Sequence, residues 1–413
     1  MRIDKVFARE VLDSRGNPTV ETEVWCGGAP ARAIAPSGAS TGKHEAHELR
    51  DGGTRFLGKG VLKAVENVNR IIAPALVGMD AAGQKEIDAK MTGLDGTENK
   101  SRLGANATVA VSMAVMKAGA AGKNQQVYEY LGGKTLPMPM LNIVNGGKHA
   151  GNSLAIQEFM IIPKGAKDFG TALCMASEVY HTLGKRLAKK YGPSARNVGD
   201  EGGFAPNLSG CFDALEEISL AIEEAGYSRE MGLAIDAAAS SFYDEKGGKY
   251  SIDGKALDSG SLLDYYSEMA KKYQILSIED PFQEEDFDSF AQITRKLGSR
   301  VQVVGDDLLV TNPKRLKTAI GKKSVNALLL KINQIGTVSE SIEVAGMCKK
   351  NGIRIVVSHR SGESEDAFIA DFAVGIDAGQ IKTGAPARGE RTCKYNQLLR
   401  ISEDRKTSLA KVF

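Results

Sequence analysis

The stretch NALLLKINQIGTVSESIEVAGMCKKNGIRIVVSH, residues 326–359, contains the structural unit that decides the fold. A short apolar run at its start and another near its end have the length of buried strands. Residues 337–352 between them have the features of a helix: Thr337 and Glu340 have capping-box spacing, and Gly352 suits the C-terminal stop. A strand, a helix and a second strand in this order predict two parallel strands joined by a crossover helix.

The same alternation of apolar runs and amphipathic segments extends over the chain beyond residue 142. The polar residues that close these runs are Asp236, Glu279, Asp306, Lys331, His359 and Lys382. After the first interval they recur every 23 to 28 positions, which is near the roughly 31 residues per unit of a (β/α)₈ barrel. A doubly wound sheet would also alternate, but no G-x-G-x-x-G follows a strand. We therefore predict an α/β fold with a C-terminal (β/α)₈-type barrel.

The residues before the barrel predict a smaller N-terminal α+β domain, as expected for a chain too long for one core. Strand-like alternation in PTVETEVWC precedes a Gly/Ser-rich loop, APSGASTGKHE, and Ala-rich helical segments such as ANATVAVSMAVMKAGAA. The stretch 131–142, LGGKTLPMPMLN, is punctuated by Gly and Pro and indicates a boundary. We place the N-terminal domain at residues 1–130 and the barrel at residues 131–413.

The composition of the 413 residues is typical of globular proteins, with 42% apolar residues, 25% charged residues and a formal net charge of +2. The absence of a basic excess argues against nucleic acid as a partner. The five scattered cysteines form no CxxC pair, so a reducing cytoplasm is favoured over a disulfide framework or a zinc site. No signal peptide and no apolar run of ~18 residues is found, so we expect no membrane span.

Three of the closing residues, Asp236, Glu279 and Asp306, are acids that would meet at one mouth of the barrel. Carboxylates packed together repel one another and require a cation, and an all-oxygen ligand set selects Mg²⁺, Mn²⁺ or Ca²⁺ over zinc. Any one of these acids alone is better explained as the cap of the following helix. Three in register favour a metal site.

Two lysines, Lys331 and Lys382, close later runs and would face the same mouth. A lysine acts as a general base only if its pKa is depressed, which burial and neighbouring cations bring about together. We therefore expect a depressed pKa at Lys331. The alternative is a surface lysine whose stem is buried and whose ammonium group is solvated.

Two loop segments carry further candidates. His359, Arg360 and Ser361 follow a predicted strand, and an arginine fork beside a hydroxyl resembles a phosphate clamp. In NVGDEGGFAP, Asp200 and Glu201 lie among glycines, which indicates either a tight turn or a carboxylate on a loop that closely approaches a substrate. A single arginine on a loop is otherwise more often solvated.

Two near-motifs are rejected. GASTGKH, residues 38–44, resembles a P-loop but has three residues between its glycines instead of four. HEAH, residues 44–47, is one residue shorter than H-E-x-x-H, so it would not place two imidazoles one helical turn apart.

Ten segments along the chain match, in the same order, the segments of one protein family. They are VLDSRGNPTVE, SGASTG, NGGKHAGNSLAIQEF, GDEGGFAP, SIEDPF, GDDLLVTNP, LLLKINQIGT, SHRSGESED, QIKTGAP and KYNQLLRI. On these segments the chain resembles the enolase (phosphopyruvate hydratase) family along almost its whole length. A departure lies in ARGERTC, where the family more often has Ser and Val around the same arginines.

The resemblance implies a barrel that begins β-β-α-α with one antiparallel strand. It also implies the reversible dehydration of 2-phospho-D-glycerate to phosphoenolpyruvate with two Mg²⁺ per active site. By the same resemblance, Asp236, Glu279 and Asp306 would hold the first Mg²⁺, and Ser40 would join the second.

The resemblance further implies that Lys331 is the general base that takes the C2 proton. Glu201, helped by Glu158, would be the general acid that protonates the departing 3-hydroxyl, and His359 would complete the catalytic group. The residues implied in substrate binding are His149, Glu158, Glu279, Asp306, Lys331, Arg360, Ser361 and Lys382.

Two other functions are compatible with this fold. One is an enolase-superfamily enzyme that abstracts a proton alpha to a carboxylate without a phosphate, against which Arg360 and Ser361 argue. The other is a non-catalytic or surface-binding paralogue, which should have lost one of the named positions. The resemblance implies homodimers or octamers and a cytoplasmic protein, and it is compatible with a secondary cell-surface or secreted pool.

Overall fold

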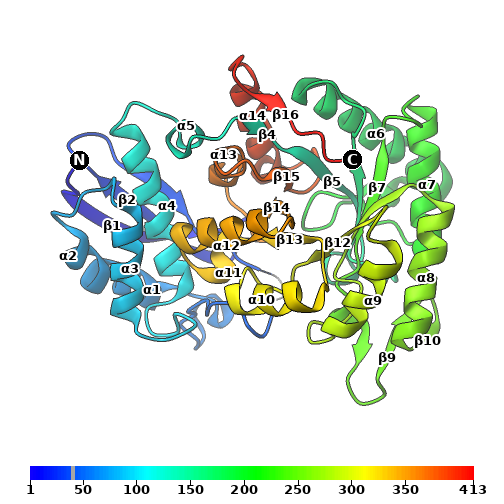
Figure 1. The fold of residues 1–413 in the computed structure, drawn as a ribbon, viewed down its shortest axis with the longest axis horizontal. Helices are drawn as coiled ribbons and strands as arrows, with labels where there is room; N and C mark the ends of the chain where they lie inside the picture. The colour runs from blue at the N-terminus through cyan, green and yellow to red at the C-terminus, as the bar shows by residue number, and fades with distance from the viewer. Residues whose placement is uncertain (39–41) are drawn as a thin grey trace.

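A computed structural model describes residues 1–38 and 42–413 of the chain. Figure 1 shows the N-terminal sheet and helices beside a larger barrel, which is surrounded by helices of the C-terminal part. This arrangement confirms the predicted fold class, a smaller α+β domain joined to an α/β barrel. Among the described residues, no helix combines the length and the apolarity that crossing a bilayer requires.

The N-terminal domain is built on an antiparallel sheet of three strands. These are β1 (Lys5–Leu12), β2 (Pro18–Trp25) and β3 (Ala31–Ile34), paired in sequence order. The helices are α1 (Leu62–Asn67), α2 (Ala73–Leu76), α3 (Gln84–Asp95), α4 (Ala105–Ala121) and α5 (Val127–Leu131). Helix α4 is Ala-rich and buried on nearly all sides because it packs on β2, β3, α3 and the barrel helices α11 and α12.

Eight strands form the closed barrel. In chain order they are β5 (Met138–Asn145), β6 (Glu158–Ile162), β7 (Gly232–Asp236), β11 (Ile275–Glu279), β12 (Gln302–Gly305), β13 (Ala327–Leu330), β14 (Arg354–Ser358) and β15 (Gly379–Lys382). From β7 to β15, and across the closure to β5, neighbouring strands are parallel. The predicted rhythm of strand and helix thus forms one continuous sheet.

The barrel begins irregularly, as the resemblance implied. Strand β6 runs antiparallel to both β5 and β7, and two helices, α6 (Phe169–Tyr191) and α7 (Cys211–Glu224), separate β6 from β7. Because β6 is reversed, its first residue lies at the end of the barrel where the other strands finish. Glu158 at the start of β6 is therefore paired with Asp236 at the end of β7.

Helices cover the outside of the barrel, and a cluster of apolar side chains lies inside it. The remaining helices are α8 (Ser259–Lys272), α9 (Phe287–Leu297), α10 (Pro313–Lys322), α11 (Ile332–Ile335), α12 (Val338–Lys350), α13 (Phe368–Gly375) and α14 (Gly389–Ser402). Helix α12 begins at the predicted cap, where the Thr337 side chain accepts a hydrogen bond from the backbone N–H of Glu340. The interior cluster includes Met138, Met160 and Leu329.

Smaller elements complete the chain. Strands β8 (Tyr243–Asp244), β9 (Lys249–Ile252) and β10 (Lys255–Leu257) form an antiparallel sheet between β7 and α8, and β4 (Thr135–Leu136) pairs with β16 (Ser408–Leu409). The described 3₁₀ helices are η1 (Arg55–Gly58), η3 (Gly147–His149), η4 (Pro193–Arg196) and η5 (Ala239–Phe242), and η2 (Val68–Ile72) is a π-helix.

Asp371 gives a prediction for the pH dependence of stability. It lies on α13, which packs on α5 and α14, and burial raises the pKa of its carboxyl group from 3.8 to about 6. The folded protein then binds this proton more tightly than the unfolded chain. The contribution of Asp371 to stability should rise as the pH falls from about 7 to about 4, by up to about 3 kcal/mol at about 1.4 kcal/mol per pKa unit.

The Asp371→Asn variant should lack this contribution. Urea unfolding of both proteins at neutral pH and near pH 4.5 measures it: the free energy of unfolding of the wild type relative to the variant should increase at the lower pH. A difference that is the same at both pH values would contradict the raised pKa.

Candidate active site

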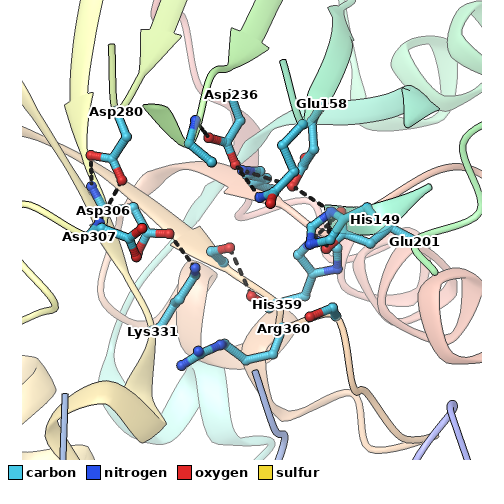
Figure 2. Close-up of a pocket in the computed structure, with 15 residues that line it drawn as sticks. His149, Glu158, Glu201, Asp236, Asp280, Asp306, Asp307, Lys331, His359 and Arg360 are labelled. Atoms are coloured by element: carbon cyan, nitrogen blue, oxygen red, sulfur yellow. Dashed lines mark hydrogen bonds and ion pairs between the residues drawn. The ribbon is translucent and has the colours of Figure 1, made fainter. Parts of the chain in front are cut away.

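The candidate residues converge at the end of the barrel where the parallel strands finish. From strand ends and the residues directly after them come Glu158, Asp236, Glu279, Asp306, Lys331, His359 and Lys382, and from loops come His149, Glu201, Arg360 and Ser361. All except Glu279 line one cavity (Figure 2). The predicted residue Ser40 lies outside the described residues.

Lys382 is the centre of the buried charges. Its Nζ lies 2.9 Å from Asp236 Oδ2, 2.8 Å from Glu279 Oε1 and 3.3 Å from Glu158 Oε1. Burial alone would lower the pKa of Lys382, but these carboxylates outweigh burial and hold the pKa well above its ordinary value. Lys382 is therefore an ammonium ion that partly neutralises three acids from three strands.

Lys331 forms the second cationic centre. Its Nζ donates a hydrogen bond of 2.5 Å to Asp306 Oδ2. Burial is the largest single influence on the pKa of Lys331 and lowers it, but the charges of Asp306 and Glu279 together outweigh burial, so the net pKa lies above the ordinary value. The predicted depression of this pKa is therefore wrong for the arrangement seen here, because no pattern in the sequence indicated that the carboxylate would approach so closely.

Two acids at the mouth, Asp280 and Asp307, were not predicted. Asp280 accepts hydrogen bonds from the backbone N–H groups of Asp306, at 3.0 Å, and Asp307, at 2.6 Å. Burial, with the charge of Asp306, raises the pKa of Asp307 to about 7. Each residue directly follows a predicted acid, in SIED and VVGDD, so the paired acids were a usable signal.

Asp280 also has a backbone φ of +42°, which is uncommon for a residue other than glycine. Such strain is tolerated where surrounding contacts fix the conformation, and functional sites are where it concentrates. The two hydrogen bonds that its carboxylate accepts supply that constraint and place Asp306 beside Lys331.

A group of two carboxyls and one imidazole lies opposite Lys331 (Figure 2). His149 Nδ1 is 3.7 Å from Glu158 Oε1 and 3.5 Å from Glu201 Oε1. Burial and the charge of Glu201 raise the pKa of Glu158 well above its ordinary value. Burial acts in the same direction on Glu201, but the facing His149 and His359, the hydrogen bond from His359 and the charge of Arg391 together outweigh burial and lower the pKa of Glu201. The proton of this pair therefore lies on Glu158.

The loop around Glu201 is held by a side-chain hydrogen bond and by close packing at a glycine. Asn142 Nδ2 on β5 donates a hydrogen bond of 3.1 Å to Glu201 Oε2. The next residue, Gly202, has a φ of +85°, and a Cβ there would lie 3.0 Å from the carbonyl oxygen of Ala387. Only glycine adopts this conformation at low cost. Gly202 thus allows the loop to pack closely against the backbone at Ala387, a requirement that neither interpretation of this segment had named.

Arg391 fixes the tautomer of His359. Its Nη1 is 2.6 Å from His359 Nδ1, and because a guanidinium group can only donate, Nδ1 must accept and Nε2 must carry the proton. His359 Nε2 then faces Glu201 Oε2 at 3.4 Å. Burial lowers the pKa of His359 to about 4, so the ring is neutral at physiological pH. Arg391, in ARGERTC, was not predicted because its partners come from distant loops.

Arg360 and Ser361 line the cavity beside His359. The backbone N–H of Arg360 donates to Glu363 Oε1 at 3.1 Å, and Lys394 Nζ holds the other oxygen of Glu363 at 2.8 Å. A buried ion pair, Lys394 with Glu363, therefore anchors the segment that carries the predicted clamp.

The donor set at the mouth suits a hard divalent cation. Glu279 Oε2 is buried and has no hydrogen-bond partner among the described residues, and its pKa is raised by burial and by the nearby Asp236. Carboxylate oxygens of Asp280, Asp306 and Asp307 lie within 4.8 Å of one another. This group shares only Asp306 with the predicted ligands Asp236, Glu279 and Asp306, and its oxygen donors are of the kind that fits a hard cation such as Mg²⁺.

His44, which both rejected motifs contain, has a partner of its own. Its Nε2 pairs with Glu285 Oε1 at 2.8 Å on an exposed surface.

A closed barrel with a charged cavity at the end where its strands finish is the arrangement found in (β/α)₈-barrel enzymes. Residues 133–411 match the family profile described as enolase, C-terminal TIM barrel domain, and residues 3–131 match that of the enolase N-terminal domain. The chain belongs to the enolase family.

Named relatives agree with this family along nearly the full length. The chain is 59% identical to the enolase of Thermococcus gammatolerans over 407 residues, 97% of this chain and 95% of the relative. It is 58% identical to the enolase of Methanocaldococcus jannaschii over 406 residues, 97% and 95% of the two chains. It is 57% identical to that of Pyrococcus furiosus over 404 residues, 97% and 94%.

The environment of His359 gives a spectroscopic prediction. With a pKa of about 4, its imidazole should show no titration between about pH 5.5 and pH 8, and its ¹⁵N shifts should report the Nε2–H tautomer. Nitrogen-15 NMR of the protein, with the His359→Gln variant used to assign the resonance, measures both. Titration near pH 6.5 would contradict the burial argument, and an Nδ1–H tautomer would contradict the role of Arg391.

Proposed function

We propose that this enzyme, a carbon–oxygen lyase, catalyses the reversible dehydration of 2-phospho-D-glycerate to phosphoenolpyruvate by the residues described above. The observation that carries the proposal is the division of the cavity. Lys331 and Asp306 lie on one side, and Glu158, Glu201 and His149 on the other (Figure 2). Removal of a proton from one carbon and departure of hydroxide from the next require a base and an acid on opposite sides of the substrate.

Lys331 is proposed as the base that takes the C2 proton. In the described state it is an ammonium ion held by Asp306, so it must release a proton before it can accept one. Any interaction that draws Asp306 away from Lys331 removes the main cause of its raised pKa and leaves burial and the charges of Arg360 and Lys382, all of which favour the neutral amine.

Glu201 and Glu158 are proposed as the acid side. The raised pKa of Glu158 favours the protonated form of this carboxyl, and its neighbour Glu201 faces the Nε2–H of His359. The pair therefore holds one proton in a buried site from which it can reach a departing hydroxyl group. Hydroxide is a poor leaving group, so this proton is essential for the second step.

Asp236, Glu279 and Asp306 are proposed as the ligands of a first Mg²⁺, and Ser40 is proposed to join a second. When bound, these ions supply the positive charge that stabilises the second negative charge developing on the substrate carboxylate. A lysine or histidine base working beside Mg²⁺ is the general pattern of enolase-superfamily sites, and the proposal follows that pattern. Lys382 adds a further fixed positive charge on that side, and Arg360 and Ser361 are proposed to bind the phosphate.

We further propose that residues 1–130 and 131–413 act as two structural domains. The chain is proposed to form homodimers or octamers and to work in the cytoplasm. These proposals are supported by the family resemblance of the sequence.

The activity is tested directly by incubating the purified protein with 2-phospho-D-glycerate. Absorbance of phosphoenolpyruvate should increase with time in Mg²⁺ and should not increase after a chelator removes the metal. Without the metal, no divalent positive charge stabilises the second negative charge that develops on the substrate carboxylate. Turnover of a non-phosphorylated hydroxy acid, with 2-phospho-D-glycerate left unchanged, would refute the proposed substrate.

Lys331→Ala and Glu201→Gln separate the two proton transfers. Lys331→Ala should lower exchange of the C2 proton with solvent by about 10²- to 10⁴-fold, whereas Glu201→Gln should retain exchange and lose dehydration. Deuterium incorporation followed by NMR, together with turnover, measures both steps. Lys317→Ala, an exposed lysine on α10, is the control and should match the wild type. Normal exchange in Lys331→Ala would exclude Lys331 as the base.

A further inference from the structure

The guanidinium group of Arg360 is bound by a residue of the N-terminal domain. Glu45 forms a two-armed ion pair with it, with Nη1 to Oε2 at 2.9 Å and Nη2 to Oε1 at 3.2 Å. The side chains of Arg360 and Glu45 are only 3% and 6% exposed. A two-armed pair of this kind fixes the plane of the guanidinium group as well as its position.

The environment of Glu45 requires a carboxylate. Besides Arg360, its Oε1 accepts from the backbone N–H of Gly42 at 3.0 Å and from Gln334 Nε2 at 3.4 Å. All of these neighbours are donors. A glutamine at this position would have to turn its NH₂ group toward one of them, since an amide has only one accepting oxygen. The isosteric substitution Glu45→Gln should therefore break the two-armed contact with Arg360.

Gln334 extends this contact to the lysine side of the cavity. Its amide nitrogen also donates to Asp306 Oδ1 at 2.9 Å, and its oxygen accepts from Thr311 Oγ1 at 2.8 Å. The two hydrogens of the amide group therefore reach two carboxylates, Glu45 in the N-terminal domain and Asp306 in the barrel. Because Asp306 Oδ2 holds Lys331, a single side chain connects Glu45 with the ion pair on that side.

Two other ion pairs that cross the domain boundary in the described part of the chain do not reach the cavity. Lys100 pairs with Glu340 at 3.0 Å, and Lys117 pairs with Asp366 at 2.6 Å; none of these four residues lines it. The pair of Glu45 with Arg360 thus differs from ordinary contacts between the domains, because one of its members lines the cavity.

We propose that Glu45 is a positioning residue for the reaction. It directs the Arg360 guanidinium group into the cavity and, through Gln334, couples that direction to the Asp306–Lys331 pair. This inference rests on the proposed function, in which Arg360 contacts the phosphate of the substrate. It also means that the barrel alone does not contain the whole site, since Glu45 precedes the barrel in the chain.

Glu45→Gln tests the proposal because the variant should affect kcat and phosphate binding differently. Loss of direction at Arg360 should lower kcat by about tenfold to a hundredfold. Inorganic phosphate, titrated by calorimetry, should bind as tightly as to the wild type or more tightly, because Arg360 keeps its charge and loses a competing anion. Loss of kcat with binding preserved is a result that mere loosening of the fold would not give.

Glu340→Gln is the matched control, since it removes the charge from a different ion pair between the domains. Its kcat and its phosphate affinity should equal those of the wild type, and thermal melting of all variants reports any loss of folding. If Glu45→Gln does not fold, Glu45→Asp retains the charge while withdrawing the carboxylate, and it should give the same split with a smaller loss.

Two results would overturn the positioning role: a kcat equal to that of the wild type, or phosphate affinity that falls in proportion to kcat. Failure of the proposed function is distinguishable. A wild-type protein that leaves 2-phospho-D-glycerate unchanged refutes the function, whereas an active wild type with an unaffected Glu45→Gln variant refutes the role of Glu45 alone.

Discussion

The structure depends on the cations and hydrogen-bond donors that face the buried carboxyl groups at the mouth of the barrel. Carboxyl groups are costly to bury unless cations or hydrogen-bond donors face them, and Lys382 Nζ alone lies within 3.3 Å of three carboxyl groups. The lysine does not satisfy all of their oxygens, because Glu279 Oε2 has no partner among the described residues. The protein therefore keeps a buried carboxyl oxygen without a partner, which is the type of ligand that hard divalent cations take.

The antiparallel start of the barrel contributes to this arrangement. Reversal of β6 brings Glu158 to the same end as Asp236 and Lys382, where a regular parallel strand would have placed its first residue at the opposite end. Glu158 becomes the carboxyl with a raised pKa, beside a second carboxyl, Glu201, whose pKa is lowered. Two chemically identical side chains thus acquire different protonation states from their surroundings.

Much of the fold and part of the site could be predicted from the sequence, because strand ends carry the polar residues of a barrel at regular spacing. The spacing located Asp306 and Lys331 without revealing their hydrogen bond, so it misjudged the pKa of Lys331. The reversed strand was available only from the family resemblance. Arg391 and Gln334 were missed because their functions depend on contacts between distant segments, and Glu45 lay inside a motif that was rightly rejected for another reason.

Closure of the barrel has a consequence for folding. Lys382 ends β15, the last strand in the chain to join the cylinder, which it completes by pairing with the first, β5. Its partner Asp236 lies 146 positions earlier in the sequence, and contacts of such separation form late because they require large loops to close. Without β15 in place, the acids of the earlier strands would lack Lys382 and would be costly to bury. Closing the cylinder and burying these acids therefore favour one another.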